Sequence, residues 1–324
     1  MSTELPVTKN AVMTEGMGAK MSVTENQASG LTPTGVDAAT WRRVHPRRYG
    51  QWAAAVACVA FLGFVVWSLA NAKIEWEIAR EYLFEASIME GLRATLVMTV
   101  LVSMAALALG TVIAVMTLSS NPVTKAAAAF YVYVFRGTPT LLQLLLWFNI
   151  ALIYPTIAIP GLWSTDTVTF MTPFMAAFIG LSLADAAYTS EIIRGGILSI
   201  DPGQTEAAQA VGLSKPQIMR RIILPQAMRV IVPPFGNSVI GMLKYTSLAA
   251  VISYNELLRN AQIIYAVNTR VVELLMVCAF WYLVCVSVLS VIQHFVEKYF
   301  ARGFGAQRNQ TSFRLRMNQH TEGV

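Results

Sequence analysis

The chain has 324 residues, of which 55% are hydrophobic and only 13% are charged. Soluble domains carry about 25% charged residues, so this composition excludes an ordinary soluble fold and indicates an integral membrane protein. The formal net charge of +6 comes largely from residues that flank apolar segments, and we therefore expect no nucleic-acid partner.

Residues 1–50 are polar and lack an apolar period, which predicts a disordered cytoplasmic tail. The pair Arg42-Arg43 is compatible with a twin-arginine signal, but Trp41 and Tyr49 beside it favour charge that flanks a membrane helix. The first apolar window, residues 51–70, predicts a membrane-spanning helix. Residues 71–91 then predict an external segment with an amphipathic stretch.

Further windows long enough to cross a bilayer, which takes ~20 mainly apolar residues, follow along the chain. They lie at residues 94–118, 137–163, 167–184, 230–255 and 274–292. The alternating segments of about 10 residues that mark an outer-membrane barrel are missing from the sequence. We therefore predict an all-α integral membrane protein with six transmembrane helices.

The distribution of Lys and Arg sets the expected orientation, because positive loops stay in the cytoplasm. With both termini and the loop 191–230 inside, most of the 24 basic residues are cytoplasmic. Only Lys73, Arg80, Arg93, Arg259 and Arg270 are then external. We predict a multi-pass protein of the bacterial cytoplasmic (inner) membrane, ending in a basic cytoplasmic tail at residues 297–324.

Polar residues interrupt several of these windows. The run Arg136-Gly137-Thr138-Pro139 predicts a helix up to Phe135, a kink, and a span from Thr140 to about Ile153. Arg136 either snorkels to the inner headgroups or lines a pathway. An ionisable group inside a span costs about 2.5–3.5 kcal/mol or more on insertion scales, so Asp185 is a functional candidate. The window 232–255 is also unusually polar, and it contributes the further candidates Asn237, Lys244, Thr246 and Ser247.

The segment Glu191–Pro234 is the one long polar interruption among the later windows. Asp201 followed by Pro202 predicts the start of a short helix, although Thr205 is an alternative cap, and Gly212 predicts its end. Ser214 then predicts the cap of a second helix. Two short helices joined at a glycine predict a rigid knob, with Glu206, Ala207 and Ala208 on its surface.

The sequence does not support catalysis by this polypeptide. The phosphate-binding pattern G-x-x-x-x-G-K-[ST] does not occur. His45, His294 and His320 lie in the termini or at a helix end, and Cys58, Cys278 and Cys285 lie inside predicted spans, so we expect no catalytic residue and no metal site.

The knob sequence resembles the cytoplasmic EAA loop of ABC-importer permeases. Glu206-Ala207-Ala208 is followed by Gly212 and by Ile222-x-Leu224-Pro225. Further stretches narrow the resemblance to permeases of polar amino acids, the histidine, glutamine, arginine and opine group. They are Phe135-Arg136-Gly137-Thr138-Pro139, Ala187-Tyr188, Glu191, Arg194-Gly195-Gly196-Ile197, Gly203-Gln204 and Ile223-Leu224-Pro225-Gln226-Ala227.

This resemblance implies a type I importer permease. Its core of five helices occupies residues 92–296, with a coupling loop at 191–230, so that helix 51–70 is an extra N-terminal helix. Glu206, Ala207, Ala208, Gly212, Leu224 and Pro225 then couple to an ATPase. The implied partners are cytoplasmic ABC ATPase subunits that bind ATP and Mg, a second permease subunit in a homo- or heterodimer, and an extracytoplasmic binding protein that delivers an amino acid. This chain would hold no cofactor.

Two positions depart from the family's usual pattern. This chain has Tyr245 where an acidic residue often follows the lysine, and Asp185 where a small or amide residue is usual. Asp185 is expected to meet the ammonium or a basic side chain of an amino acid, with Lys244 or Arg136 meeting the carboxylate. Alternatively, Asp185 and Lys244 pair with each other.

The leading hypothesis is a permease subunit that forms the pathway for ATP-driven import of an amino acid or a close derivative. The alternatives are a secondary transporter or channel that works without ATP, and a sensor or scaffold that uses the same fold.

Overall fold

A computed structural model describes residues 49–71, 74–159 and 163–300. The chain divides into two compact units, residues 1–72 and 73–324. Helix α1 (Tyr49–Ala70) is the described element of the first unit, at the position of the first predicted span. Several of its large apolar side chains, among them Trp52, Phe61 and Trp67, are exposed. Apart from residues 49–50 and 297–300, the predicted tails lie outside the described residues.

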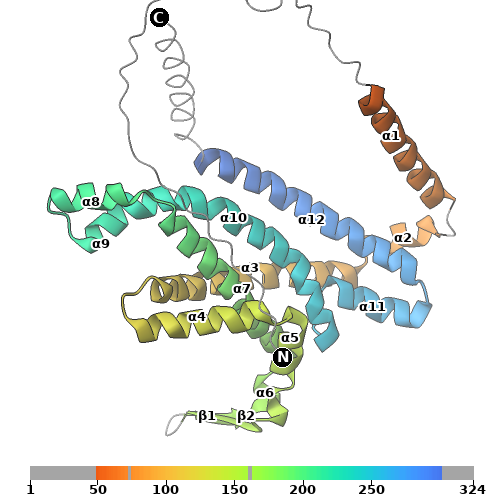
Figure 1. Ribbon diagram of the computed structural model, residues 1–324. Coiled ribbons are helices and arrows are strands. Elements are labelled where there is room, and N and C mark those ends of the chain that lie inside the picture. The colour runs from red at the N-terminus through yellow and green to blue at the C-terminus, as the bar shows by residue number, and fades with distance from the viewer. Residues whose placement is uncertain (1–48, 72–73, 160–162, 301–324) are drawn as a thin grey trace, which may run out of the picture. The chain divides into compact units, whose positions relative to one another are not determined.

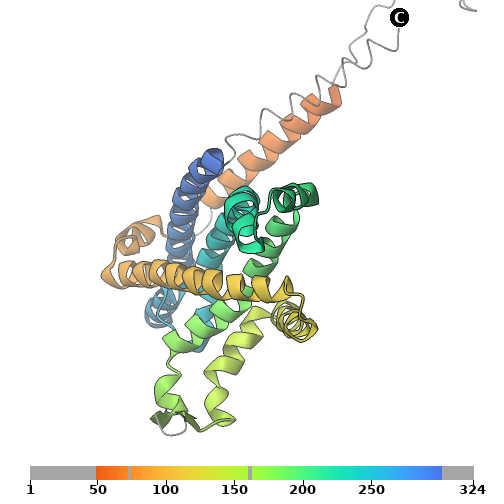
Figure 2. The same cartoon turned by 90° about the vertical axis from the view of Figure 1, so that its left-hand side faces the viewer.

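The second unit is a bundle of helices with one small β-hairpin (Figures 1 and 2). Its elements are α2 (Trp76–Tyr82), α3 (Ala86–Thr117), α4 (Pro122–Gly137), α5 (Thr140–Phe148), η2 (Ile150–Leu152), β1 (Thr156–Ile159), β2 (Trp163–Asp166), α6 (Thr167–Phe170), α7 (Pro173–Leu198), α8 (Pro202–Ala210), α9 (Lys215–Ile218), η3 (Met219–Ile223), α10 (Leu224–Tyr245), η4 (Thr246–Ile252), α11 (Leu257–Asn268) and α12 (Val271–Phe300). The prediction of a helical membrane protein is confirmed.

Three of the described helices, α3, α7 and α12, are long and apolar enough to cross a bilayer by length and composition. The window 137–163 does not form one helix, because the chain breaks at Thr138-Pro139 as predicted and α5 is short. The window 230–255 is divided between α10 and the 3₁₀-helix η4. The count of six spans therefore remains a prediction.

Helix α7 packs at the centre of the bundle, and small residues allow close approach to its neighbours. A Cβ added at Gly110 of α3 would lie 2.9 Å from the Thr189 Cβ atom of α7. A Cβ added at Gly180 of α7 would lie 2.9 Å from the Leu144 Cδ2 atom of α5. The buried cluster between these helices includes Met98, Val102, Leu144, Leu181 and Met242.

A fully buried carboxylate joins three helices of this unit. Glu256 caps α11 by accepting hydrogen bonds from the backbone N–H groups of Leu258 (3.0 Å) and Arg259 (2.8 Å). It also accepts hydrogen bonds from the hydroxyls of Tyr282 of α12 (2.9 Å) and Thr95 of α3 (3.5 Å). Most of residues 256–272, between the last two apolar windows of the sequence, form α11, and Glu256 anchors its start.

One difference from the sequence analysis is the β-hairpin. Strands β1 and β2 pair antiparallel, with Thr156 opposite Asp166 and Ile159 opposite Trp163. The sequence pattern does not indicate strands here, because Pro155, Pro160 and Gly161 are residues that usually mark a loop. The hairpin and the α8–α9 pair lie at opposite ends of the bundle in both views (Figures 1 and 2).

Candidate functional site

The α8–α9 pair, which we call the knob (residues 201–218), is built by local capping. The Asp201 side chain accepts a hydrogen bond from the Gly203 backbone N–H (2.8 Å), and Pro202 is the first residue of α8. Helix α8 ends with bonds from Gly212 N–H to the Gln209 carbonyl (2.9 Å) and from Leu213 N–H to the Ala208 carbonyl (3.1 Å). This is the Schellman arrangement, and Gly212 has the positive φ of +84° that it requires.

Helix α9 starts with a capping box between Ser214 and Gln217. Asp201, Pro202, Gly212 and Ser214 therefore have the local roles that were predicted for them.

The exposed face of α8 combines small residues with one acidic side chain. Glu206 and Ala207 are exposed, and Val211 is 76% exposed. Ala208 is 4% exposed and packs with Ile218 and Ile223, so the expectation that it contributes to the outer face is wrong. It instead fixes α8 onto the rest of the knob.

The knob continues directly into α10. The five residues of η3 form a π-helical turn, and Leu224 and Pro225, both exposed, begin α10 directly after it. On the other side, Ile197 of α7 and Ile200, which follows that helix, pack against the cluster that contains Ile223. Movement of the knob therefore has a continuous route into α7 and α10.

A cavity of about 360 Å³ lies among α5, α7 and α10. Its volume falls within the range of about 300–1,000 Å³ that is usual for ligand pockets. The lining residues are Thr140, Leu181, Ala184, Asp185, Tyr188, Ile192, Pro234, Asn237, Ser238, Gly241, Met242 and Tyr245. Asp185 is the one charged residue among them, and its carboxylate accepts a hydrogen bond of 2.9 Å from the Ser238 hydroxyl.

The structure brings together only some of the predicted pathway residues. Asp185 and Asn237 line the cavity, whereas Arg136, Lys244, Thr246 and Ser247 do not. Lys244 is exposed, and none of the ion pairs among the described residues includes it, so the alternative pairing of Asp185 with Lys244 is absent here. The Thr246 hydroxyl is buried and bonds to the Leu243 carbonyl (2.8 Å).

Sequence reasoning missed Ser238 as the partner of Asp185, and Tyr188 and Thr140 as lining residues. Ser238 lies one position after Asn237 in the polar stretch of α10, so its place there was the available signal. Tyr188 lies one helical turn after Asp185, which puts both residues on the same face of α7.

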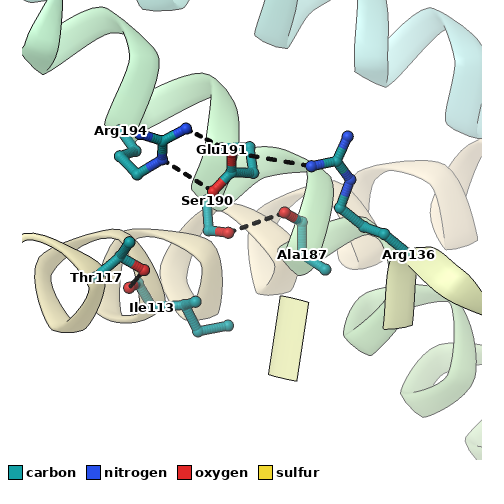
Figure 3. Close-up of polar contacts among 7 residues, drawn as sticks. All are labelled: Ile113, Thr117, Arg136, Ala187, Ser190, Glu191 and Arg194. Atoms are coloured by element: carbon teal, nitrogen blue, oxygen red, sulfur yellow. Dashed lines mark hydrogen bonds and ion pairs between the residues drawn. The ribbon is translucent and has the colours of Figure 1, made fainter. Parts of the chain in front are cut away.

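Arg136 takes a role that neither sequence interpretation described. Its guanidinium Cζ lies 5.1 Å from the centre of the Tyr188 ring, and its Nη1 atom lies 3.9 Å from a carboxylate oxygen of Glu191. Glu191 also accepts two hydrogen bonds from Arg194, at 3.0 and 2.8 Å (Figure 3). This cluster ties the α4–α5 break to α7 beside the cavity, because Tyr188 belongs to both.

The hydroxyl groups near this cluster bond within their own helices. Ser190 donates to the Ala187 carbonyl and Thr117 donates to the Ile113 carbonyl, at 2.8 and 2.9 Å (Figure 3). Arg136 of α4 and Glu191 of α7 make a polar contact across helices beside them, as the Tyr131 hydroxyl of α4 does by donating to the Leu183 carbonyl of α7 (2.8 Å).

The sequence pattern of the family described as "Binding-protein-dependent transport system inner membrane component" matches residues 106–305. The chain belongs to this family. It is 39% identical over 301 residues to the arginine transport system permease protein ArgU of Corynebacterium glutamicum, with 92% of each chain covered. It is 35% identical over 228 residues to the probable amino-acid permease protein YxeN of Bacillus subtilis, covering 69% of this chain and 95% of that one.

A crystal structure of an amino acid ABC transporter with histidines aligns with a TM-score of 0.59 and 35% identity, over 67% of this chain and 95% of that one. The resemblance drawn from the EAA pattern is thus confirmed: the chain is a permease subunit of an amino-acid ABC importer of the inner membrane, and transport is driven by ATP through a separate ATPase. Membership of this family does not support the alternatives of an ATP-independent transporter or of a sensor.

Proposed function

We propose that this permease imports a basic amino acid, with arginine as the first candidate, and that Asp185 receives the cationic group in the cavity. The observation that carries the proposal is the charge of the cavity. Asp185 is 8% exposed, and within the described part of the chain no Lys or Arg lines the same cavity. A buried carboxylate without a cationic partner is unfavourable. Binding of a cationic substrate beside it is therefore more favourable than binding of a neutral one.

The neighbours of Asp185 support this assignment. The Ser238 hydroxyl donates one hydrogen bond to the Asp185 carboxylate, which holds it towards the cavity and leaves other acceptor sites on its oxygens. Asn237 and the hydroxyl groups of Thr140 and Tyr188 supply neutral polar groups for the remainder of an amino acid. The similarity to an arginine permease agrees with this class of substrate.

The energy for transport enters at the knob. The exposed Glu206 and Ala207 form a small face with one negative charge, which suits a groove on an ATPase subunit. Gly212 fixes the shape of the turn, and Leu224 and Pro225 begin the helix that carries the movement. ATP and Mg would be bound by that partner, since the phosphate-loop pattern does not occur in this sequence.

The remaining features of the proposal concern assembly and orientation. Six spans, with α1 as an extra N-terminal helix, would place both termini and the knob in the cytoplasm, as the distribution of Lys and Arg favours. A second permease subunit, identical or related, would complete the pathway. An extracytoplasmic binding protein would deliver the amino acid, as the family description implies.

The experiment is a comparison of Asp185→Asn with the wild type in uptake by cells or proteoliposomes. The substitution keeps shape and hydrogen-bonding capacity but removes the charge. We expect normal membrane abundance and ATPase assembly, with arginine uptake lowered about ten-fold or more, as for loss of a hydrogen bond to a charged group. Competition with glutamine should then become as effective as competition with arginine.

Glu90→Gln is the matched control, because Glu90 is an exposed acid of α3 that does not line the cavity. Unchanged uptake and selectivity in a stable Asp185→Asn protein would remove Asp185 from the substrate site. Loss of folded protein in Asp185→Asn would instead assign Asp185 a structural role.

A further inference from the structure

Helix α10 has a weak point in its middle. Pro233 and Pro234 both lie inside the helix, and neither has a backbone N–H. The carbonyls of Arg229 and Val230, four residues earlier, therefore lose their intrahelical donors. We call residues 233–236 the proline segment. Such a segment is where a helix bends.

A buried amide from another helix is placed against this segment. Gln293 of α12 is 9% exposed, and its Nε2 atom donates hydrogen bonds to the Pro233 carbonyl (3.1 Å) and to the Glu297 carboxylate (2.9 Å). The space for the amide exists because residue 236 is glycine, since a Cβ there would overlap the Gln293 side chain. A buried amide in an apolar helix is unfavourable unless it is hydrogen-bonded, so this contact specifies how α12 meets α10.

The seam around this contact opens to the surface as a groove. The groove, of about 200 Å³, lies between α10 and α12, and its lining includes Val232, Gly236, Ile240, Leu289, Gln293 and Val296. On this side no side chain of α12 fills the space beside the proline segment, so the segment has room to change its angle while the Gln293 amide stays bonded to the Pro233 carbonyl.

The proline segment also lies between the two functional parts of the permease. On one side, the helical stretch Leu224–Val232 leads back through the π-helical turn to the knob. On the other side, Pro234, Asn237 and Ser238 line the substrate cavity, and Ser238 holds Asp185. A bend at this point changes the position of the cavity wall relative to the knob.

We propose that Gln293 is a positioning residue for transport: its amide clamps the proline segment of α10 to α12, so that movement of the knob turns the cavity wall instead of being lost as bending. The clamp rests on the proposed function above, because it needs the knob to receive the ATPase. Without the clamp, ATP hydrolysis continues and moves less substrate per ATP.

The experiment uses the purified complete transporter in proteoliposomes, with its ATPase and binding protein, and measures uptake and ATP hydrolysis together. Gln293→Met keeps the volume and removes the hydrogen bonds. Gly236→Ala keeps every hydrogen-bonding group but pushes the amide away. We expect each variant to retain ATPase activity stimulated by the binding protein and to lower the ratio of substrate moved to ATP hydrolysed by about three-fold or more, the range in which residues of a coupling network act.

The double variant should equal Gln293→Met alone, because both changes act on one contact. His294→Met is the matched control on α12, since His294 is exposed beside Gln293, and Gly63→Ala is the control glycine, since a Cβ there meets nothing within 4 Å. Both controls should keep the wild-type ratio.

Three results would overturn the clamp: a wild-type ratio in Gln293→Met, additive losses in the double variant, or loss of folded protein in both single variants, which would assign Gln293 a purely structural role. These results are distinct from failure of the proposed function. In that case the wild-type complex itself would show no ATP-dependent uptake, or Asp185→Asn would leave selectivity unchanged.

Discussion

The single residue Glu256 connects three helices of the permease. Its carboxylate has no exposed surface and receives hydrogen bonds from two backbone N–H groups and two hydroxyls. These donors come from α3, α11 and α12, so the residue fastens the start of α11 to both long helices. In this respect it differs from Asp185, whose carboxylate has one side-chain partner and faces a cavity.

We expect Glu256→Ala to destabilise the permease by about 2 kcal/mol or more, because it removes a helix cap and leaves buried donors unpaired. Thermal unfolding of the detergent-solubilised protein would show this as a lower melting temperature. Glu90→Ala, at an exposed position of α3, should leave the melting temperature unchanged. An unaltered melting temperature in Glu256→Ala would show that the network adds no net stability.

The sequence indicated the importance of some buried polar residues but not of others. Asp185 stood out because a charge within an apolar window is conspicuous in one dimension. Glu256 and Gln293 did not, because they lie at or near the ends of predicted spans, where polar residues are ordinary. Their importance depends on donors and acceptors from helices that are distant in the sequence.

At the scale of elements, the knob was the most predictable part of the permease. Its caps and its glycine turn are formed within a few residues of one another, so their residue types alone indicate them. The β-hairpin and the burial of Ala208 were missed. The hairpin contains residues that usually mark a loop, and the burial of Ala208 depends on packing against Ile218 and Ile223.

Gly212→Val should leave the permease in the membrane and abolish uptake. A Cβ at Gly212 would meet no atom of this chain within 4 Å, so the constraint comes from its φ of +84°. A non-glycine residue in this conformation costs about 1–2 kcal/mol, and a β-branched one is least tolerated, so the turn of the knob should change.

Gly212→Asn is the matched control, because asparagine accepts the left-handed conformation. It should retain most of the uptake, measured beside membrane abundance in the same cells. Normal uptake by Gly212→Val would contradict the role given to the shape of the turn.

At the largest scale, the second unit carries the knob, for which we propose the ATPase contact, at one end, and a cavity lined by one negatively charged residue, Asp185, lies within the bundle. The EAA pattern was enough to predict the family, and the family match confirmed it. The shape of the cavity was beyond the sequence, because α5, α7 and α10 bring its lining together from three separate stretches of the chain.

The most direct test of this account is uptake of labelled arginine by proteoliposomes that contain the permease, with ATPase, binding protein and internal ATP omitted one at a time. The account predicts uptake by the complete system only, and loss of uptake on each omission. Arginine uptake that continues without the ATPase or without ATP would contradict it, and would show that the permease moves its substrate by another source of energy.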